Sequence, residues 1–306
     1  MPNAVATATG IVKRFGKTTA LDDVAIEVRT GLMTGLVGPD GAGKTTLIRI
    51  LAGLIDPDAG ETSVLGNSAT EVDRAEIGYM PQRFGLYEDL TVIENLRLYA
   101  DLRGLERSAR EASFGKLLDF TDLEQFQSRL AGKLSGGMKQ KLGLACALVR
   151  QPKLLLLDEP GVGVDPVSRR ELWQMVRDLT GEGVGVLWST AYLDEAEQCD
   201  TVFLLNEGKM LHGGPPGDLL ARVEGRVFRV TVPASERRHQ LAIMLDRDDV
   251  EDGTVQGAGV RLLMRAKATP TGFGSEAVQP VKPRFEDGFI DMLGAKVLGT
   301  SALAAA

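Results

Sequence analysis

A glycine-rich segment near the start of the chain has the residue types and spacing that bind a phosphate chain. It matches the pattern G-x-x-x-x-G-K-S/T, follows the apolar run at residues 32–37 and precedes a stretch with helical apolar spacing. Glycines let the backbone curl so that N–H groups point inward, and a helix N-terminus adds a positive dipole end. We expect Lys44 to reach the terminal phosphates and the Thr45 hydroxyl to hold Mg²⁺, although an ordinary strand-to-helix turn is the alternative. The residues predicted to contact the phosphates are Gly38, Pro39, Asp40, Gly41, Ala42, Gly43, Lys44, Thr45 and Thr46.

Two carboxylates end a second apolar run. Residues 154–157 are all leucine, as suits a strand buried on both faces, and Asp158, Glu159 and Pro160 follow directly. Ligands of open α/β sheets gather at the carboxyl ends of the strands, so Asp158 is a predicted Mg²⁺ ligand. Glu159 is then the candidate for polarising an attacking water. An acidic strand end by itself is more often a turn, but together with the glycine-rich segment it favours catalysis.

A third segment, Leu134–Gln140, lies between these two. Its sequence, LSGGMKQ, predicts another helix N-terminus, where Ser135, Gly136 and Gly137 offer a hydroxyl and close backbone amides to an anion. This segment resembles the signature motif of ABC ATPases, and the resemblance covers about residues 5–222. In that family the anion is the γ-phosphate of ATP bound by the opposite subunit. The resemblance therefore implies ATP and Mg²⁺ as cofactors and a second ABC nucleotide-binding domain as partner, either a tandem half or another copy.

The same resemblance implies roles for three further residues. Phe15 stands where the family stacks an aromatic ring on adenine, although a core phenylalanine of a small sheet is the alternative. Gln82 stands at the family's Q-loop, which senses Mg²⁺ and faces the membrane partner, so Gln82 joins Lys44 and Glu159 in the implied catalytic set. Asp165 matches an aspartate at the dimer interface, and a solvated turn acid is the simpler alternative.

The whole pattern resembles the drug-exporter branch of ABC ATPases, and within it the first nucleotide-binding half of tandem proteins. Residues 283–290, PRFEDGFI, resemble the Pro-x-Leu-Glu-Asp-x-Phe element near the C-terminus of such subunits. An amphipathic helix packed on a C-terminal appendage is what this element predicts. The resemblance also implies an integral membrane permease as partner, export of a drug or small amphipathic substrate, and a cytoplasmic protein held at the inner face of the cell membrane through that permease.

One position departs from the family pattern. After the run at residues 184–188, family members carry a histidine that contacts the γ-phosphate, and here Ala191 stands at that position. The two histidines of the chain, His212 and His239, lie well beyond this segment. A methyl group cannot donate a hydrogen bond, and losing one transition-state donor reduces the rate on the order of 10²–10³-fold. We therefore expect this domain to bind ATP but to hydrolyse it slowly, while its segment 134–138 completes a faster site on the partner domain.

Two smaller departures lie beside the predicted site. Asp40 stands where the family usually has asparagine, and it adds a negative charge beside the phosphates. Gly161 stands where serine or threonine is common. We expect both to tune affinity at most.

These segments require a scaffold of alternating strands and helices. Residues 1–222 alternate in this way, which predicts a mostly parallel sheet flanked by helices. With the resemblance, the predicted fold class is α/β: a P-loop NTPase of ABC type with a RecA-like core, an antiparallel β arm and a helical subdomain at about residues 83–132. The candidate core residues of that subdomain are Leu96, Leu98, Leu102, Leu117, Leu118 and Phe120. The helix after the glycine-rich segment is expected to bury Leu47, Ile48, Leu51, Leu54 and Ile55.

The pattern changes after the Gly-Gly-Pro-Pro stretch at residues 213–216, which predicts a small α+β appendage at residues 223–294. Within it, residues 227–232 alternate like a strand and residues 235–247 look helical. Val255 together with residues 260–264 suggests a hairpin. Residues 295–306 are small and apolar with little periodicity, which is typical of a linker or tail.

Composition narrows the function classes. The 306 residues, 43% of them hydrophobic, are enough for one large domain and a smaller one. The net charge of -7 offers no general attraction to nucleic acid, which we do not expect as a partner. No apolar run approaches the roughly 20 residues that cross a bilayer, and we expect no secretory leader. Cys146 and Cys199 lack metal-ligand spacing and are expected to be reduced core thiols. A soluble ABC protein acting on ribosomes and an ATP-dependent clamp without turnover stay open as alternatives.

Overall fold

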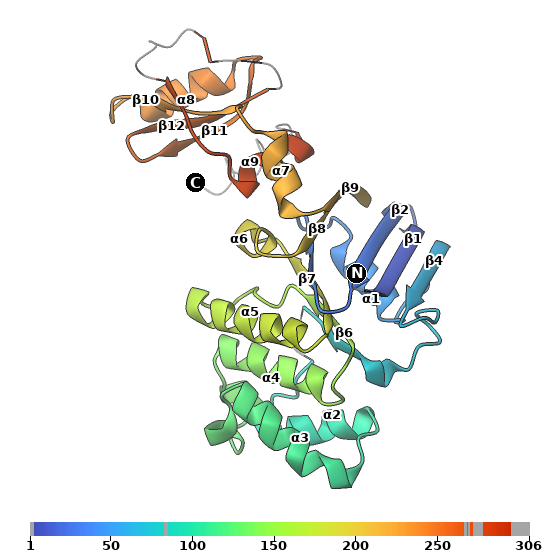
Figure 1. Ribbon diagram of the computed structural model, residues 1–306. Helices are drawn as coiled ribbons and strands as arrows, with labels where there is room; N and C mark the ends of the chain where they lie inside the picture. Colours follow the sequence, from blue (N-terminus) through green and yellow to red (C-terminus); the bar gives the residue numbers. More distant parts are fainter. Residues whose placement is uncertain (1–2, 83–84, 266–267, 269, 272–277, 295–306) are drawn as a thin grey trace. The chain divides into compact units, whose positions relative to one another are not determined.

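The computed structural model describes residues 3–82, 85–265, 268, 270–271 and 278–294. The chain divides into two compact units, Met1–Gly213 and Gly214–Ala306 (Figure 1). The predicted boundary at residue 222 would leave helix α7 (Pro216–Arg222) in the first unit, whereas α7 belongs to the second. The reason is packing, because α7 contacts helix α9 (Phe285–Leu293) and Arg222 Nε lies 2.5 Å from Asp291 Oδ2. The predicted tail at residues 295–306 lies outside the described residues.

A six-stranded sheet forms the centre of the first unit. The strand order is β5-β6-β7-β3-β8-β9, and the pairs β5–β6, β6–β7, β7–β3 and β3–β8 are parallel. Every residue of β3, β6 and β7 is buried, as the continuous apolar runs predict for strands covered on both faces. The mostly parallel sheet is therefore confirmed. The strands are β3 (Met33–Val37), β5 (Ile77–Met80), β6 (Leu154–Asp158), β7 (Gly185–Thr190), β8 (Thr201–Asn206) and β9 (Lys209–Gly214).

A second, antiparallel sheet forms the arm of this unit. It has the order β2-β1-β4, and the strands are β1 (Ala4–Phe15), β2 (Thr18–Arg29) and β4 (Ala59–Val64). Apolar residues along β1 and β2 alternate with more exposed ones, as expected when one sheet face packs on the core. This sheet matches the predicted antiparallel arm.

Helices complete the first unit, and two of them lie in the predicted helical subdomain. The helices of this unit are α1 (Lys44–Leu51), α2 (Val92–Leu102), α3 (Arg107–Phe120), α4 (Gly136–Leu148), α5 (Pro166–Gly181) and α6 (Leu193–Ala196), and α2 and α3 are the two in the subdomain. Short 3₁₀ turns lie at Arg74–Glu76, Glu124–Phe126 and Ala131–Lys133. Figure 1 shows α4 and α5 side by side, and the two helices contact each other.

Two predicted core positions are wrong. Leu102 is 71% exposed because it is the last residue of α2. Leu54 is 49% exposed because α1 ends at Leu51 and Gly53 turns the chain with φ 65°. The other predicted core positions, Leu47, Ile48, Leu51, Leu96, Leu117 and Leu118, are buried, and Ile55, Leu98 and Phe120 are half-buried.

The second unit is an α+β fold. Its antiparallel sheet has the order β11-β12-β10-β13, with β10 (Val227–Thr231), β11 (Val250–Gln256), β12 (Gly259–Met264) and β13 (Val278–Pro280). Helix α8 (Arg237–Leu245) contacts β11, and β11 and β12 form the predicted hairpin. Helix α9 falls on the predicted amphipathic element, and its Asp287 lies 2.6 Å from the buried Arg261.

Two expectations from composition concern cysteines and membrane spans. Cys146 and Cys199 are both buried free thiols, as predicted. Among the helices of the described residues, none combines the length and the apolar character that crossing a membrane requires.

Candidate active site

The glycine-rich loop joins β3 to α1, and its conformation requires glycine at several positions. A Cβ atom on Gly38 would lie 2.0 Å from the Leu205 carbonyl oxygen. Gly43 has φ 110°, and a Cβ there would lie 2.5 Å from the Ala20 carbonyl oxygen. Gly41 has open space around it but a φ of 78°. The loop thus depends on close backbone approach and on left-handed backbone, and it leads into a helix whose first N–H groups lack helical partners.

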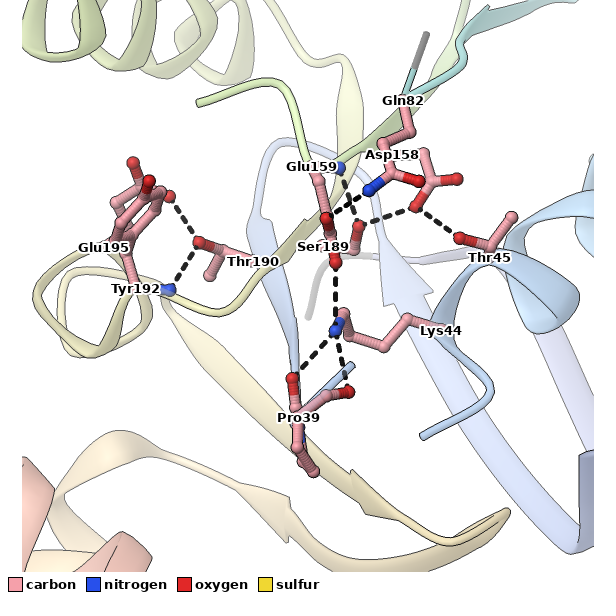
Figure 2. A network of polar contacts seen from close by, with 11 residues as sticks. Pro39, Lys44, Thr45, Gln82, Asp158, Glu159, Ser189, Thr190, Tyr192 and Glu195 are labelled. Atoms are coloured by element: carbon pink, nitrogen blue, oxygen red, sulfur yellow. Dashed lines mark hydrogen bonds and ion pairs between the residues drawn. The ribbon is translucent and has the colours of Figure 1, made fainter. Parts of the chain in front are cut away.

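Lys44 is the first residue of α1 and is buried at the centre of the site. It is 4% exposed, and its Nζ atom donates to the carbonyl oxygens of Gly38 at 2.7 Å and Pro39 at 3.1 Å. The third contact of Nζ is with Glu159 Oε1 at 3.0 Å (Figure 2). An ammonium group has three donors, so these contacts use its full capacity.

Asp158 ends β6 and lies against hydroxyl groups from two other elements. Thr45 Oγ1 donates to Asp158 Oδ1 at 3.1 Å, and Ser189 Oγ at the end of β7 donates to the same oxygen at 3.0 Å. Burial raises the pKa of Asp158, and the charge of Glu159 adds to this while the two hydroxyls act in the opposite direction. The second oxygen, Oδ2, is buried and has no hydrogen-bond partner among the described residues. A buried carboxylate oxygen without a partner, beside a threonine hydroxyl, fits a Mg²⁺ ligand set.

Glu159 has an unusual backbone and a side chain held from two sides. Its φ of 52° is left-handed, a conformation that non-glycine residues adopt mainly where the surrounding structure enforces it. The Glu159 N–H donates to Ser189 Oγ at 2.8 Å, which helps to hold this backbone. Gln82 Nε2 donates to Glu159 Oε2 at 2.7 Å, while Oε1 faces Lys44. Glu159 therefore lies between the glycine-rich loop and the segment after β5 (Figure 2).

A cavity of about 290 Å³ opens beside these groups. It brings together most of the residues predicted from the glycine-rich segment with both Gln82 and Glu159. Its lining consists of Ala20, Asp40, Gly41, Ala42, Gly43, Lys44, Thr45, Thr46, Gln82 and Glu159. Phe15, Ser135–Gly137 and Asp165 are not part of this lining.

The signature-like segment forms the N-terminus of α4. Ser135 is exposed and its Oγ accepts from the Met138 N–H at 3.3 Å, as a helix cap does. The two glycines pack closely on the segment before α5 and on α5 itself. A Cβ on Gly136 would lie 3.0 Å from the Gly163 carbonyl oxygen, and one on Gly137 would lie 2.5 Å from Cβ and Oγ of Ser168. Packing within this chain is therefore a second reason for glycine at both positions.

Phe15 and Asp165 do not line the cavity. Phe15 ends β1 and is 53% exposed, so the alternative of a core phenylalanine is wrong. Asp165 is exposed and caps α5, because its Oδ1 accepts from the N–H groups of Val167 and Ser168, each at 3.0 Å. Hydrogen bonds with Ser168, first of all the one from its backbone N–H, lower the pKa of Asp165. The exposed acid at the start of a helix thus has a structural role already.

Ala191 lies exposed in the loop between β7 and α6. Ser189, two residues before it, is a residue that sequence analysis missed, although its hydroxyl contacts the carboxylate of Asp158 and the backbone N–H of Glu159. The available signal was a serine at the carboxyl end of a predicted buried strand, because polar side chains at that edge face the ligand in open α/β sheets.

The known proteins that this chain resembles are ATP-binding proteins of transporters and exporters. The family model described as "ABC transporter" matches residues 21–162. The chain is 54% identical to "Probable multidrug ABC transporter ATP-binding protein YbhF" of Escherichia coli (strain K12), over 100% of this chain and 55% of that protein. It is 35% identical to "Nod factor export ATP-binding protein I" of Paraburkholderia xenovorans (strain LB400), over 83% of this chain and 86% of that protein.

A solved structure described as "Structure of ATP binding subunit of ABC transporter" is also similar. It matches with a TM-score of 0.65 and 33% identity, over 71% of this chain and 92% of that one. The chain spans about half the length of the YbhF protein that it matches.

Proposed function

The chain belongs to the ABC transporter family of ATP-binding proteins, and from this premise we propose that it binds Mg²⁺·ATP and hydrolyses it to drive an exporter. The observation that carries the proposal is that Lys44, Thr45 and Glu159 line one cavity, while Asp158 accepts a hydrogen bond from Thr45. A lysine, a hydroxyl and two carboxylates are the groups that phosphoryl transfer from ATP requires. The ATPase class itself follows from family membership.

Lys44 and the glycine-rich loop would hold the phosphates. Lys44 would exchange its contact with Glu159 for oxygens of the β- and γ-phosphates, and the loop amides would donate to the same chain of phosphates. Glu159, released from Lys44, would then polarise the attacking water, with Gln82 as the neighbour that orients it. Phe15, exposed at the end of β1, is the candidate for stacking on adenine.

Asp158, Thr45 and Gln82 would hold Mg²⁺. The buried Oδ2 of Asp158 supports this assignment, since a buried carboxylate oxygen without a partner is costly. Bound Mg²⁺ supplies positive charge that neutralises the phosphate oxygens. The protein's own contribution is to hold the carboxylate and the hydroxyl side by side before binding, which Ser189 assists.

This site is proposed to turn over slowly because Ala191 supplies no donor to the γ-phosphate. Glu159 argues for retained hydrolysis, since a site that only clamps ATP needs no group to polarise water. The signature segment, Ser135–Gly137, would complete the ATP site of a second ABC nucleotide-binding domain, with Asp165 at the same interface. We propose these two roles, slow hydrolysis at the chain's own site and completion of the partner's site, because the histidine is missing while the other groups are present.

Export through a membrane permease is the proposed use of the ATP. Two relatives carry names that refer to multidrug transport and to Nod factor export, so a drug or small amphipathic molecule is the proposed substrate. Gln82 would face the permease, which would hold this chain at the inner face of the cell membrane. A soluble ABC protein of ribosomes is the alternative, but long basic insertions typical of that class do not occur in the sequence.

The test combines binding with assembly. Isothermal titration calorimetry of the chain with ATP and Mg²⁺ should show one site per chain. Affinity purification from detergent-solubilised cells should retain a membrane permease and no ribosomal proteins, and the assembled complex should hydrolyse ATP. Recovery of ribosomes instead of a permease would favour the alternative, and binding without any turnover in the complex would favour the clamp.

A further inference from the structure

Glu195 is a buried carboxylate that the proposed ATP site does not use. It lies in α6, is 3% exposed, and its Oε2 atom accepts from Thr190 Oγ1 at 2.6 Å and from Trp188 Nε1 at 2.9 Å. Its Oε1 atom faces Arg169 Nε at 3.4 Å. Removing a carboxylate from water costs several kcal/mol unless partners compensate, so this set of contacts requires an explanation. We call Glu195, Thr190, Trp188 and Arg169 the Glu195 cluster.

The Glu195 cluster joins three separate elements of the first unit. Trp188 and Thr190 come from β7, Glu195 comes from α6, and Arg169 lies near the start of α5. The Tyr192 N–H donates to Thr190 Oγ1 at 2.9 Å, so the chain on both sides of Ala191 is tied to one hydroxyl (Figure 2). Arg169 also lies 4.1 Å from the centre of the Tyr192 ring, which adds a cation–π contact.

Gly161 shows how closely the cluster is packed. A Cβ atom on Gly161 would lie 2.9 Å from Glu195 Oε1 and 3.1 Å from Arg169 Cδ. Glu195 is held by its hydrogen bonds and Arg169 by its ion pairs, so neither side chain can move away easily. Glycine at this position therefore fits the close packing of the cluster.

The Glu195 cluster is connected to Asp158 and Glu159 through Ser189, the residue directly before Thr190. Thr190 follows Ser189, whose Oγ donates to Asp158 Oδ1 at 3.0 Å and accepts from the Glu159 N–H at 2.8 Å. In the parallel pairing of β6 and β7, Ser189 lies directly opposite Asp158. A shift of the end of β7 would therefore change the placement of both carboxylates.

We propose that Glu195 is a positioning residue for the ATP site: by holding Thr190 it fixes Ser189, and through Ser189 it orients Asp158 and Glu159. Glu195 does not touch the nucleotide in this proposal. Its role is larger here than where a histidine at position 191 contacts the phosphate, because Ala191 offers the loop no such anchor. The inference rests on the proposed function, since it assigns a role toward the same Mg²⁺·ATP site.

The test uses the full chain and measures ATP affinity by calorimetry, once with Mg²⁺ and once with a chelator. The ratio of the two dissociation constants, the Mg²⁺ gain, reports how well Asp158 is oriented for the metal. Changes to groups that orient metal ligands reduce metal affinity about 10–100-fold, so Thr190→Val and Glu195→Gln should each lower the Mg²⁺ gain about 10-fold. Affinity for metal-free ATP should change less than about twofold, because Lys44 and the loop amides are untouched.

Two controls separate positioning from general damage. Thr190→Ser keeps the hydroxyl and should keep the Mg²⁺ gain. Asp194→Asn removes a second carboxylate that Arg169 contacts, at 3.1 Å, but this carboxylate is exposed and its loss should leave the gain unchanged.

Three outcomes would count against the inference. An unchanged Mg²⁺ gain in both Thr190→Val and Glu195→Gln, with normal ATP binding, would overturn this inference alone. A parallel loss in Thr190→Ser would show that hydroxyl contact is not the cause, and would also overturn it. Absence of ATP binding in the unaltered chain would overturn the proposed function and this inference with it.

Discussion

Two helix N-termini of the first unit resemble each other in sequence, but their surroundings differ. Each has small residues at its start: the loop Gly38–Gly43 precedes α1, and Ser135–Gly137 form the cap and the first two residues of α4. At α1 the chain itself supplies charged groups of both signs, because Lys44 and Glu159 are 4% and 7% exposed and contact each other. A cavity lies beside them.

At α4 the small residues serve a different arrangement. Gly137 packs on Ser168 and Gly136 on the carbonyl of Gly163, while Ser135 is exposed and caps the helix. Lys139, about one turn into α4, is already paired within the chain, because its Nζ atom lies 2.6 Å from Glu88 Oε1. The difference fits our proposal that the α1 end holds the ATP of this chain, whereas the α4 end offers its surface to a second nucleotide-binding domain.

The largest expected effect comes from Lys44→Ala. Removing one partner of a buried, hydrogen-bonded charge pair costs about 2–5 kcal/mol, so ATP should bind at least about 30-fold more weakly. Calorimetry on the purified chain measures this, with Lys116→Ala, an exposed lysine of α3, as the control. Unchanged ATP affinity in Lys44→Ala would contradict the assignment of the whole site to α1.

The next effect tests whether the α1 site is complete for catalysis. Ala191→His should raise the ATPase rate of the purified complex about 10–100-fold at this site, because one positioned donor contributes on the order of 10²–10³ in rate and a new one is placed less well. Ala191 is exposed, so the loop has room for a ring. Ala191→Phe adds a ring without a donor and should give no gain. If the histidine variant is no faster than the phenylalanine variant, slow turnover has another cause.

Local patterns predict the part of the site that one stretch of chain builds. The strand, the glycine-rich loop and α1 are consecutive, and so are β6, Asp158 and Glu159, so an apolar run followed by the right side chains is sufficient. Helix ends are less local. Leu54 and Leu102 have helical spacing but lie beyond or at the last turn, where no further turn covers them.

Contacts between separate strands are not predictable in the same way. Ser189 contacts Asp158 only because β6 and β7 are neighbours in parallel register, and no pattern in either strand names its neighbour. Glu195 belongs to a polar stretch typical of a helix start, yet it is buried by β7 and α5. The contact between Lys44 and Glu159 likewise joins two motifs that are far apart along the chain.

A smaller effect is expected from Ser135→Ala, which tests the second half of the comparison. ATP affinity of this chain should not change, because Ser135 does not line its cavity. The ATPase rate of the assembled complex should fall at least about 10-fold, since a hydrogen bond to a charged group contributes about 1.5–3 kcal/mol. Thr91→Ala is a matched control, because Thr91 caps α2 in the same way but lies outside the signature segment. Equal losses of ATPase in both variants would mean that only the helix cap matters.

The smallest effect is expected from Gly137→Ala, which asks whether packing alone requires the glycine. The new Cβ would lie 2.5 Å from Ser168, so the start of α5 must shift, and the free energy of unfolding should fall by about 1 kcal/mol. Calorimetric melting of the chain measures this loss. Gly115→Ala is the control, because Gly115 lies within α3 with open space around it and should gain about 0.5–1 kcal/mol from helix propensity. Adding Ser168→Gly to Gly137→Ala removes the opposing atoms and should restore part of the stability. If Gly137→Ala is as stable as the control, close packing on α5 is not why this position is glycine, and anion binding at α4 is left as the reason.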